Sequence, residues 1–165
     1  MNAGNLIRSA HAFGASFVFA INAHQRVRKA KSDTSKTPQH LPFYMWDNIA
    51  AMQLPIDCRL VGVELTDEAV DLPSFRHPAR AAYVLGPERG MLSPEMLEKC
   101  DLVVKIPTKF CINVATAGAI IMYDRVRSLG KFPCRPVVPS SPQQDLPEHA
   151  FGAPRSRTKS AKNVS

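Results

Sequence analysis

The sequence lacks a hydrophobic run long enough to cross a membrane. Its 165 residues are 45% hydrophobic and 21% charged, a composition that can fill one globular core, but no apolar stretch approaches the roughly 20 residues of a spanning helix. The N-terminus also lacks the basic segment, apolar block and cleavage site of a secretory leader. These absences exclude a transmembrane protein, and we expect a cytoplasmic one.

Metal-ligand and disulfide patterns are missing as well. The four cysteines are far apart and form no CxxC pair, which argues against a zinc site and against a disulfide framework. His11 and His77 have no cysteine or acidic residue at ligand spacing, so we expect surface or core histidines rather than catalysts. We therefore expect no metal and four free thiols, which are those of Cys58, Cys100, Cys111 and Cys134.

Positive charge is in excess and is unevenly placed. The net charge is +7; residues 24–40 and residues 131–165 carry +4 each, and the rest of the chain carries −1. Clustered flexible cations attract polyphosphate by counterion release, so nucleic acid is the leading partner class, ahead of an acidic membrane surface. On charge alone, two soluble linkers explain the same pattern equally well.

Two segments stand apart from a single folded domain. The stretch from residue 131 onward contains six of the 14 prolines and has no hydrophobic period, which is typical of a disordered tail. Residues 22–42 are polar and basic and include Pro38 and Pro42, which favours a long surface loop. We expect one domain over residues 1–130, followed by a Pro-rich basic tail over residues 131–165.

Helices and strands are expected to alternate within the domain. Hydrophobic spacing predicts helices over 5–13, 46–53, 94–99 and 113–126, with a helical turn over 67–72. β-Branched and aromatic runs predict strands over 16–21, 59–64, 81–85 and 102–106. The helix over 113–126 is apolar almost all round, which predicts burial on several sides and allows packing on a partner subunit. This alternation predicts an α/β fold with a mostly parallel sheet flanked by helices.

Three segments carry Gly, Asn, Arg or Glu where ordinary strand-to-helix connections need none of them. Residues 2–10 (NAGNLIRSA) place an arginine beside the N–H groups of a helix start, which suits a phosphate. Residues 85–92 (LGPERGML) follow a strand, and their glycines allow a ligand to approach closely. Residues 106–113 (IPTKFCIN) join a strand to the long helix, at the sheet edge where α/β folds bind ligands. Taken singly, each segment has a simpler explanation. The first is explained by a helix cap, the second by a turn and the third by the N-cap of the last helix.

The order and spacing of these segments resemble the SpoU/TrmH branch of the SPOUT RNA methyltransferases. The family's first motif, of the type N-x-G-x-x-x-R, matches Asn2, Gly4 and Arg8. Its second motif, a strand followed by LGPE-x-G, matches residues 85–90, and its third, I-P followed by S-x-N-V and a small-residue helix, matches residues 106–115. The resemblance covers about residues 1–130. It implies an α/β knot, in which the C-terminal segment threads a loop to form the pocket for S-adenosylmethionine (AdoMet), and it implies a homodimer.

The resemblance further implies AdoMet as the cofactor and RNA, not a membrane, as the partner. Members of this branch mostly methylate a ribose 2′-hydroxyl of tRNA or rRNA. By motif match, Arg8 acts at the hydroxyl and its neighbouring phosphate, as a clamp and electrostatic stabiliser, because an arginine stays protonated and is a poor base. Asn2 would orient Arg8 or the ribose, and Glu88 would hold Arg8 or substrate. Asn113 would donate at the active-site end of the last helix. The implied cofactor-binding residues are Leu85, Gly86, Ile106, Pro107, Ile112, Val114 and Ala115.

The chain departs from the family pattern at two places. Cys111 stands where the family usually has serine, and a thiol is a weaker hydrogen-bond donor than a hydroxyl. The family also places a strand directly before its first motif, so the first strand is missing from this sequence. Either the start codon lies further upstream, which we favour, or the sheet lacks one strand and leaves apolar surface and ladder groups uncovered. A catalytically weak RNA-binding relative is therefore the alternative hypothesis, and base methylation is a third.

Two smaller groups of side chains have competing interpretations. Phe43, Tyr44 and Trp46 could stack on unpaired bases, but we expect them to pack in the core. Lys105 and Lys109 flank the expected pocket, and phosphate contact and plain solvation fit the sequence equally well.

Overall fold

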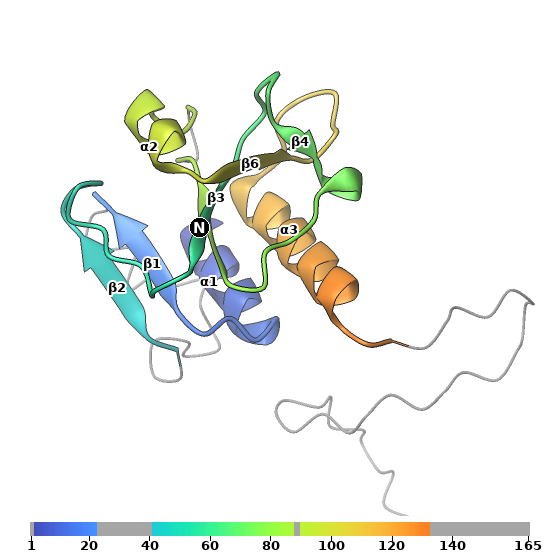
Figure 1. The fold of residues 1–165 in the computed structure, drawn as a ribbon, viewed down its shortest axis with the longest axis horizontal. Coiled ribbons are helices and arrows are strands. Elements are labelled where there is room, and N and C mark those ends of the chain that lie inside the picture. Colours follow the sequence, from blue (N-terminus) through green and yellow to red (C-terminus); the bar gives the residue numbers. More distant parts are fainter. Residues whose placement is uncertain (1, 23–40, 88–89, 133–165) are drawn as a thin grey trace, which may run out of the picture. The chain divides into compact units, whose positions relative to one another are not determined.

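A computed structural model describes residues 2–22, 41–87 and 90–132 (Figure 1). The chain divides into two compact units, residues 1–131 and 132–165, and the fold below is that of the first. Most of the basic segment over 22–42, nearly all of the tail and Glu88 lie outside the described residues, and so do the predictions made for them. Within the described part, no helix is both long and apolar enough to cross a bilayer.

Helices and strands are mixed along the described chain, and they alternate only in its C-terminal half. The helices are α1 (Asn2–Ala12), α2 (Pro94–Lys99) and α3 (Val114–Leu129), with a short 3-10 helix at Leu72–Ser74. The strands are β1 (Val18–Ile21), β2 (Phe43–Trp46), β3 (Arg59–Val63), β4 (Val70–Asp71), β5 (Ala81–Leu85) and β6 (Leu102–Lys105). β5 and α2 have the predicted bounds, and the Ser93 hydroxyl caps α2 by accepting from the Met96 N–H at 3.2 Å.

All strand pairs are parallel and form two sheets. β1 pairs with β2, and the larger sheet has the order β4-β6-β3-β5 (Figure 1). β3 therefore lies between β5 and β6, with Val61 opposite both Tyr83 and Leu102. Parallel strands of one sheet need a crossover connection, and α2 lies in the connection that leads from β5 past β3 to β6. The mixed α/β class with parallel sheets is confirmed.

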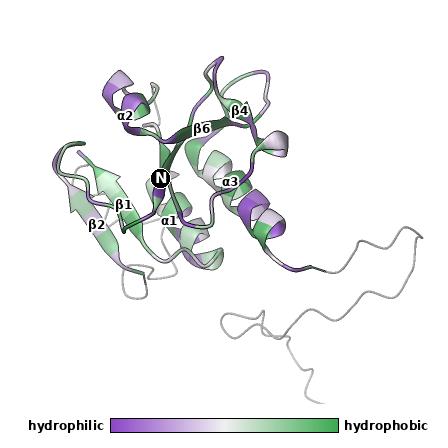
Figure 2. Ribbon diagram, in the orientation of Figure 1, coloured by the Kyte–Doolittle hydropathy of each residue, from purple (hydrophilic) through white to green (hydrophobic). Residues whose placement is uncertain are grey.

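Hydrophobic clusters cover both faces of the larger sheet. Successive residues of a strand point to opposite faces, and Leu60 of β3 belongs to one cluster while Val61 belongs to the other. The first cluster includes Met96 of α2, and the second includes Ile121 of α3, so each helix covers one face. Figure 2 shows hydrophobic residues along the strands and hydrophilic residues in the C-terminal half of α3.

A glycine lets α1 pack closely on α3. A Cβ atom at Gly118 would overlap Leu6 Cδ1 and would lie 3.6 Å from Leu85 Cδ2. The contact therefore joins α1, α3 and the end of β5, and it depends on the missing side chain. The buried residues of α3 are Ala115, Ala117, Gly118 and Ile121.

Two predicted elements differ from the structure. The helix predicted over 46–53 is wrong, because the aromatic run 43–46 pairs with β1 as β2. A turn follows, in which the Asn48 side chain accepts the Ala51 N–H at 2.8 Å, a local bond that competes with helix formation. The helical turn predicted over 67–72 is replaced by a turn, β4 and the start of the 3-10 helix, because β4 pairs with β6.

The aromatic residues of β2 divide between core and surface. Trp46 packs with Phe19 at a ring-centroid distance of 5.6 Å and lies against the first hydrophobic cluster. Phe43 is half-buried, whereas Tyr44 is 50% exposed and stacks on Trp46. The prediction of core packing is confirmed for Trp46 and is wrong for Tyr44, which lies on the same side of β2 but keeps half of its side chain exposed.

An apolar groove lies between the two sheets. Its cavity volume is about 540 Å³, and α1, β1, β5 and α3 contribute to its walls. In the described part of the chain, β1 has β2 as its one strand neighbour and β5 has β3. Both strands that border the groove therefore have an edge whose backbone groups have no strand partner.

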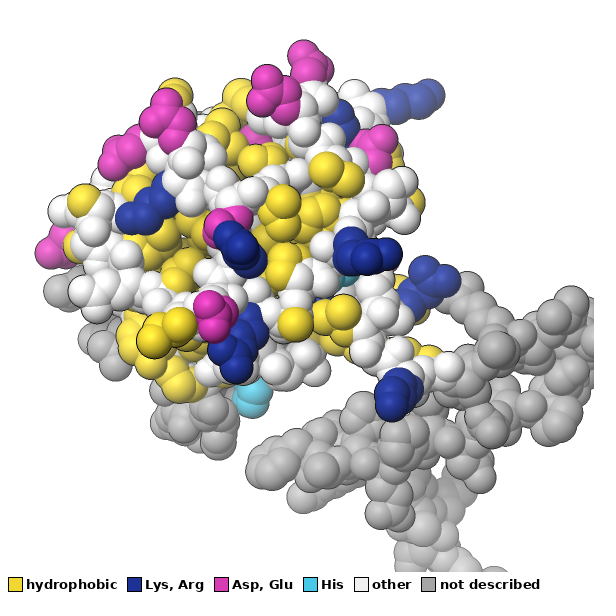
Figure 3. Space-filling view, in the orientation of Figure 1, with side chains coloured by type: hydrophobic (Ala, Val, Ile, Leu, Met, Phe, Trp, Pro, Cys, Tyr) yellow, Lys and Arg dark blue, Asp and Glu magenta, His cyan; other side chains and the backbone are white. Residues whose placement is uncertain are grey.

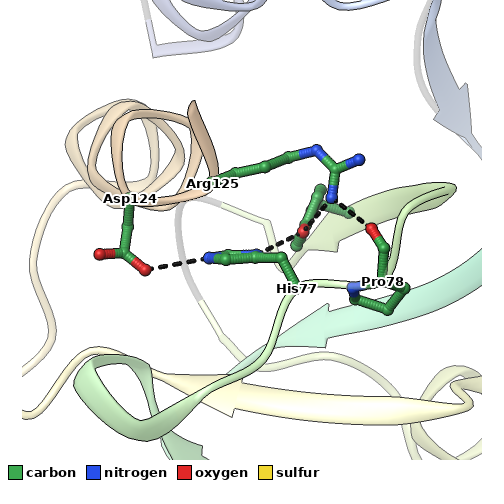
Figure 4. Close-up of polar contacts among 5 residues, drawn as sticks. His77, Pro78, Asp124 and Arg125 are labelled. Carbon is green, nitrogen blue, oxygen red and sulfur yellow. Dashed lines mark hydrogen bonds and ion pairs between the residues drawn. The ribbon is translucent and has the colours of Figure 1, made fainter. Parts of the chain in front are cut away.

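A buried polar cluster ties α3 to the segment before β5 (Figure 4). His77 is 4% exposed; its Nδ1 lies 2.6 Å from the Tyr83 hydroxyl and its Nε2 lies 3.0 Å from Asp124 Oδ2. Arg125 donates to the Pro78 carbonyl at 2.6 Å and to the Tyr83 oxygen at 3.2 Å. The Tyr83 hydroxyl therefore joins the His77 ring to the Arg125 guanidinium, and Asp124 lies at the other nitrogen of the ring. His77 is thus a core histidine, as predicted.

Candidate active site

A cleft opens at the carboxyl ends of three neighbouring strands. β3, β5 and β6 are parallel, so their carboxyl ends meet at one edge of the sheet, where α/β folds bind ligands. The cavity volume of the cleft is about 180 Å³. Its lining residues are 63–65, 85–87, 90, 105, 106, 108, 111–114 and 117.

The loop after β5 folds back over the end of its strand. Gly90 has a φ of 110°, a conformation that favours glycine. A Cβ atom at Gly86 would lie 3.3 Å from the Leu92 nitrogen and 3.5 Å from Glu64 Oε2, so glycine leaves room for the returning chain. Leu92 itself is buried in the first hydrophobic cluster. The two glycines of the second motif therefore shape one wall of the cleft.

Glu64 joins this loop to the end of β3. Its Oε2 accepts the Leu92 N–H at 2.8 Å, and its Oε1 accepts the Leu65 N–H at 2.9 Å. The Glu64 N–H donates to the Val104 carbonyl at 3.1 Å, which extends the pairing of β3 with β6. The sequence motifs missed Glu64; its place at the carboxyl end of a predicted strand was the one available signal.

The loop after β6 forms the opposite wall. Thr108 Oγ1 donates to the Phe110 carbonyl at 2.9 Å, while the Phe110 side chain is 75% exposed. Cys111, which replaces the usual serine of the family, is exposed and lines the cleft. Lys105 also lines the cleft, and its Nζ donates to the Thr66 carbonyl at 3.0 Å, so this cation holds the chain after β3.

Asn113 places the start of α3 at the cleft. Its Oδ1 accepts the N–H groups of Ala115 at 2.9 Å and Thr116 at 3.4 Å. The simple explanation of this asparagine as an N-cap is therefore confirmed, and the same residue lines the cleft. The N-terminal end of a helix favours negative charge, so α3 adds a partial positive charge to this wall.

Five of the seven predicted cofactor-binding residues line one cleft. Pro107 and Ala115 are neighbours of lining residues in the sequence but do not line the cleft; Pro107 is exposed and Ala115 is buried. The five that line it are Leu85, Gly86, Ile106, Ile112 and Val114. The second and third motifs therefore converge.

The predicted catalytic residues do not all line the cleft. Asn113 lines the cleft, whereas Arg8 is exposed on α1 and lies outside the lining. Asn2 is the first residue of α1, but its side chain is outside the described part, as is the whole of Glu88. The first motif therefore lies on the helix that packs against α3, beside the element whose start forms the cleft.

The described thiols differ in their surroundings. Burial raises the pKa of Cys100 to about 11, and burial also raises the pKa of Cys58. Both thiols stay protonated near neutral pH and are poor nucleophiles. Cys58, Cys100 and the exposed Cys111 are free thiols, as predicted, while Cys134 lies outside the described residues.

Fold and cleft together define an α/β protein with a candidate ligand site where a glycine-containing loop meets the carboxyl edge of a parallel sheet. The sequence matches the model of the SpoU rRNA Methylase family over residues 1–123. The chain belongs to this family.

Individual relatives share both sequence and fold with the chain. It is 27% identical over 136 residues to the mouse protein described as tRNA (guanosine(18)-2′-O)-methyltransferase TARBP1, a match that covers 76% of this chain and 8% of the mouse protein. AviRb, a SpoU methyltransferase from Streptomyces viridochromogenes solved with AdoMet, has a TM-score of 0.65 and 26% identity over 76% of this chain and 55% of AviRb.

A third comparison concerns the fold alone. An AdoMet-bound rRNA methyltransferase from Sinorhizobium meliloti has a TM-score of 0.70 and 21% identity, over 79% of this chain and 52% of that one. The chain thus spans about half the length of these solved structures and a small part of the mouse protein.

Proposed function

We propose that this protein transfers the methyl group of AdoMet to a ribose 2′-hydroxyl of tRNA or rRNA. The observation that carries the proposal is the convergence of the second and third motifs in one cleft, with the first motif on the adjoining helix. Membership of the SpoU family supports it. So do the two relatives above 25% identity, since one is described as a tRNA 2′-O-methyltransferase and the other holds AdoMet.

The chemistry of the cleft suits this cofactor. Leu85, Ile106 and Val114 offer apolar surface to an adenine ring, and the strand ends offer backbone groups to its polar edge. Glu64 places a carboxylate in a cleft whose ligand carries a positively charged sulfur. AdoMet supplies an activated methyl group when bound; the protein has to hold it and admit the ribose from the opposite side.

The first motif supplies the RNA-binding part of the mechanism. In an in-line displacement the hydroxyl oxygen approaches the methyl carbon opposite the sulfur, so positioning is the main requirement. Arg8 binds the phosphate beside the target ribose and stabilises the charge that develops on the hydroxyl oxygen. Asn2 orients Arg8 or the ribose, and Glu88 holds Arg8 or substrate. Asn113 donates from the start of α3.

An assay of methyl transfer to RNA tests this function and distinguishes it from the alternative, a catalytically weak RNA-binding relative. Purified chain, labelled AdoMet and total tRNA and rRNA should give labelled RNA, and Arg8→Ala should lower the rate at least about 100-fold, because it removes a charged stabilising group. Arg76→Ala, which changes another exposed arginine, is the matched control. Wild-type chain that binds AdoMet and RNA but transfers no methyl would favour the RNA-binding relative instead.

Alkylation of Cys111 tests the cofactor site without RNA. This thiol is exposed and lines the cleft, whereas Cys100 lies outside it and is protonated near neutral pH. Iodoacetamide should modify Cys111 faster than Cys100, and saturating AdoMet should slow the reaction at Cys111 alone. Mass spectrometry of the digested protein measures both rates. An unchanged Cys111 rate in the presence of AdoMet would contradict this placement of the cofactor.

We propose that the groove between β1 and β5 takes one further strand, parallel to both. The two unpartnered edges, the parallel direction of every pair and the apolar walls support this assignment. A strand of this kind directly before α1 would make one sheet from two. A chain extended by in-frame upstream codons should melt at a higher temperature than residues 1–165, whereas an in-frame stop immediately before Met1 would contradict an upstream strand.

We also propose the knotted topology and the homodimer of the family. Ile120 and Tyr123 on α3 are 36% and 54% exposed and give a second copy an apolar contact surface. Figure 3 shows hydrophobic side chains at the surface over the middle of one face. Sedimentation should show a dimer that Tyr123→Glu weakens. A monomeric wild type at micromolar concentration would contradict the dimer.

The last assignments concern the division into domain and tail and the location in the cell. We propose a catalytic domain over residues 1–130 and a basic tail over 131–165 that contacts RNA in the cytoplasm. Removing the tail should weaken RNA binding and reduce its salt dependence while AdoMet binding stays the same. Unchanged RNA affinity would contradict a role for the tail.

A further inference from the structure

Glu64 places a carboxylate in the cleft. Both of its oxygens accept backbone N–H groups, from Leu65 and Leu92. Within residues 2–22, 41–87 and 90–132, no Lys, Arg or His side chain pairs with it, and it is the one acidic residue that lines the cleft. Lys105, the one basic lining residue, instead donates to the carbonyls of Thr66 and Asp67.

The charge of Glu64 is stabilised by backbone donors. Each carboxylate oxygen accepts one N–H group, whereas a neutral amide side chain has a single acceptor oxygen and could not accept both. The two N–H groups fix the carboxylate at the base of the loop that Gly86 and Gly90 shape. A fixed negative charge at this place favours a ligand that brings its own positive charge.

We infer that Glu64 is a specificity-determining residue that makes the cleft prefer AdoMet to its product, S-adenosylhomocysteine. This inference rests on the proposed function. The two molecules differ by one methyl group and by the positive charge on sulfur, which the product lacks. Glu64 attracts the charged donor more than the uncharged product, and so it helps the product to leave after each transfer.

Calorimetric titration of the full chain with each of the two ligands tests this role. Glu64→Gln keeps the size and one acceptor oxygen but removes the charge, and it should weaken AdoMet binding about fivefold more than it weakens product binding, as expected for the loss of one partly screened charge pair. Glu68→Gln, an exposed neighbour outside the cleft lining, is the control and should change neither affinity.

The ratio of the AdoMet affinity to the product affinity distinguishes a role of Glu64 in ligand specificity from a role in supporting the loop after β5. A structural role alone predicts equal losses for both ligands in Glu64→Gln, and that result would overturn the inference. If Glu64→Gln does not fold, Glu64→Asp keeps the charge and should retain the AdoMet preference; loss of the preference there would also overturn it. A wild-type chain that binds neither ligand would overturn the proposed function, and this inference with it.

Discussion

Polar side chains in the described interior have hydrogen-bond partners, some of them far away in the sequence. Among the described residues, no buried side-chain nitrogen or oxygen lacks a hydrogen-bond partner. Tyr83 is the centre of one such network, because its hydroxyl joins His77 to Arg125. Burial raises the pKa of Tyr83, so its hydroxyl stays protonated and can donate to His77.

Loss of the Tyr83 hydroxyl should destabilise the fold. Tyr83→Phe leaves His77 Nδ1 and one Arg125 donor without this partner, which costs about 1–3 kcal/mol in the free energy of unfolding. Tyr44→Phe, at an exposed position outside the dimer surface proposed on α3, should change it by less than about 0.5 kcal/mol. Urea denaturation measures both. Equal stabilities of the two variants would show that the network contributes nothing.

Asp101 should make stability depend on pH. The Arg59 guanidinium donates to Oδ1 and the Leu60 N–H to Oδ2, each at 2.7 Å, and these bonds lower the pKa of Asp101. A lowered pKa stabilises the fold above the carboxyl's usual pKa, and the contribution is lost as the pH falls through the folded-state value. Asp101→Asn should cost about 1 kcal/mol at neutral pH, since both side chains are partly exposed.

Urea denaturation of wild type and Asp101→Asn, at neutral and at acid pH, measures this contribution and supplies the control. Below the lowered pKa of Asp101 the wild-type carboxyl is protonated, so wild type and Asp101→Asn should converge in stability. A stability difference that stays constant from neutral to acid pH would contradict this assignment.

At the scale of whole elements, the contact of α1 with α3 positions the first motif beside the cleft. Gly118 allows this contact, because a Cβ atom there would overlap Leu6 Cδ1. Alanine is normally the better helix residue by about 0.5–1 kcal/mol. Here Gly118→Ala should instead destabilise by about 1–3 kcal/mol, since the two helices have to separate.

A second substitution isolates the steric cause. Leu6→Ala removes the atom that the new Cβ would overlap, so the double variant should be less destabilised than the sum of the two single variants. Thermal or urea denaturation of the wild type, the two single variants and the double variant completes this double-mutant cycle. Strict additivity would mean that α1 and α3 are not held together through this contact.

Elements with strong local signals were predictable from the sequence. Ser93 followed by Pro94 marks the start of α2, and Asn113 marks the start of α3. β2 was missed because its aromatic run precedes a polar turn, and only pairing with β1, more than 20 residues earlier, decides its structure. Local periodicity does not record such pairings.

The same limit applied to the candidate site. Gly86 and Ile106 were found through their motifs, whereas Glu64 carries no motif and becomes visible once β3 lies between β5 and β6. His77 was expected to be a surface or core residue, and its partner Asp124, which is 47 residues away, could not be named from the sequence.

For the molecule as a whole, the central claim is that one sheet edge and the neighbouring helix α1 form a ribose methyltransferase site. The most direct measurement is nucleoside mass spectrometry of tRNA and rRNA after incubation with AdoMet that carries a deuterated methyl group. The account predicts deuterated 2′-O-methylnucleosides with the wild-type chain and their loss with Arg8→Ala. Deuterium on a base, or no deuterium in RNA while AdoMet and RNA both bind, would contradict it.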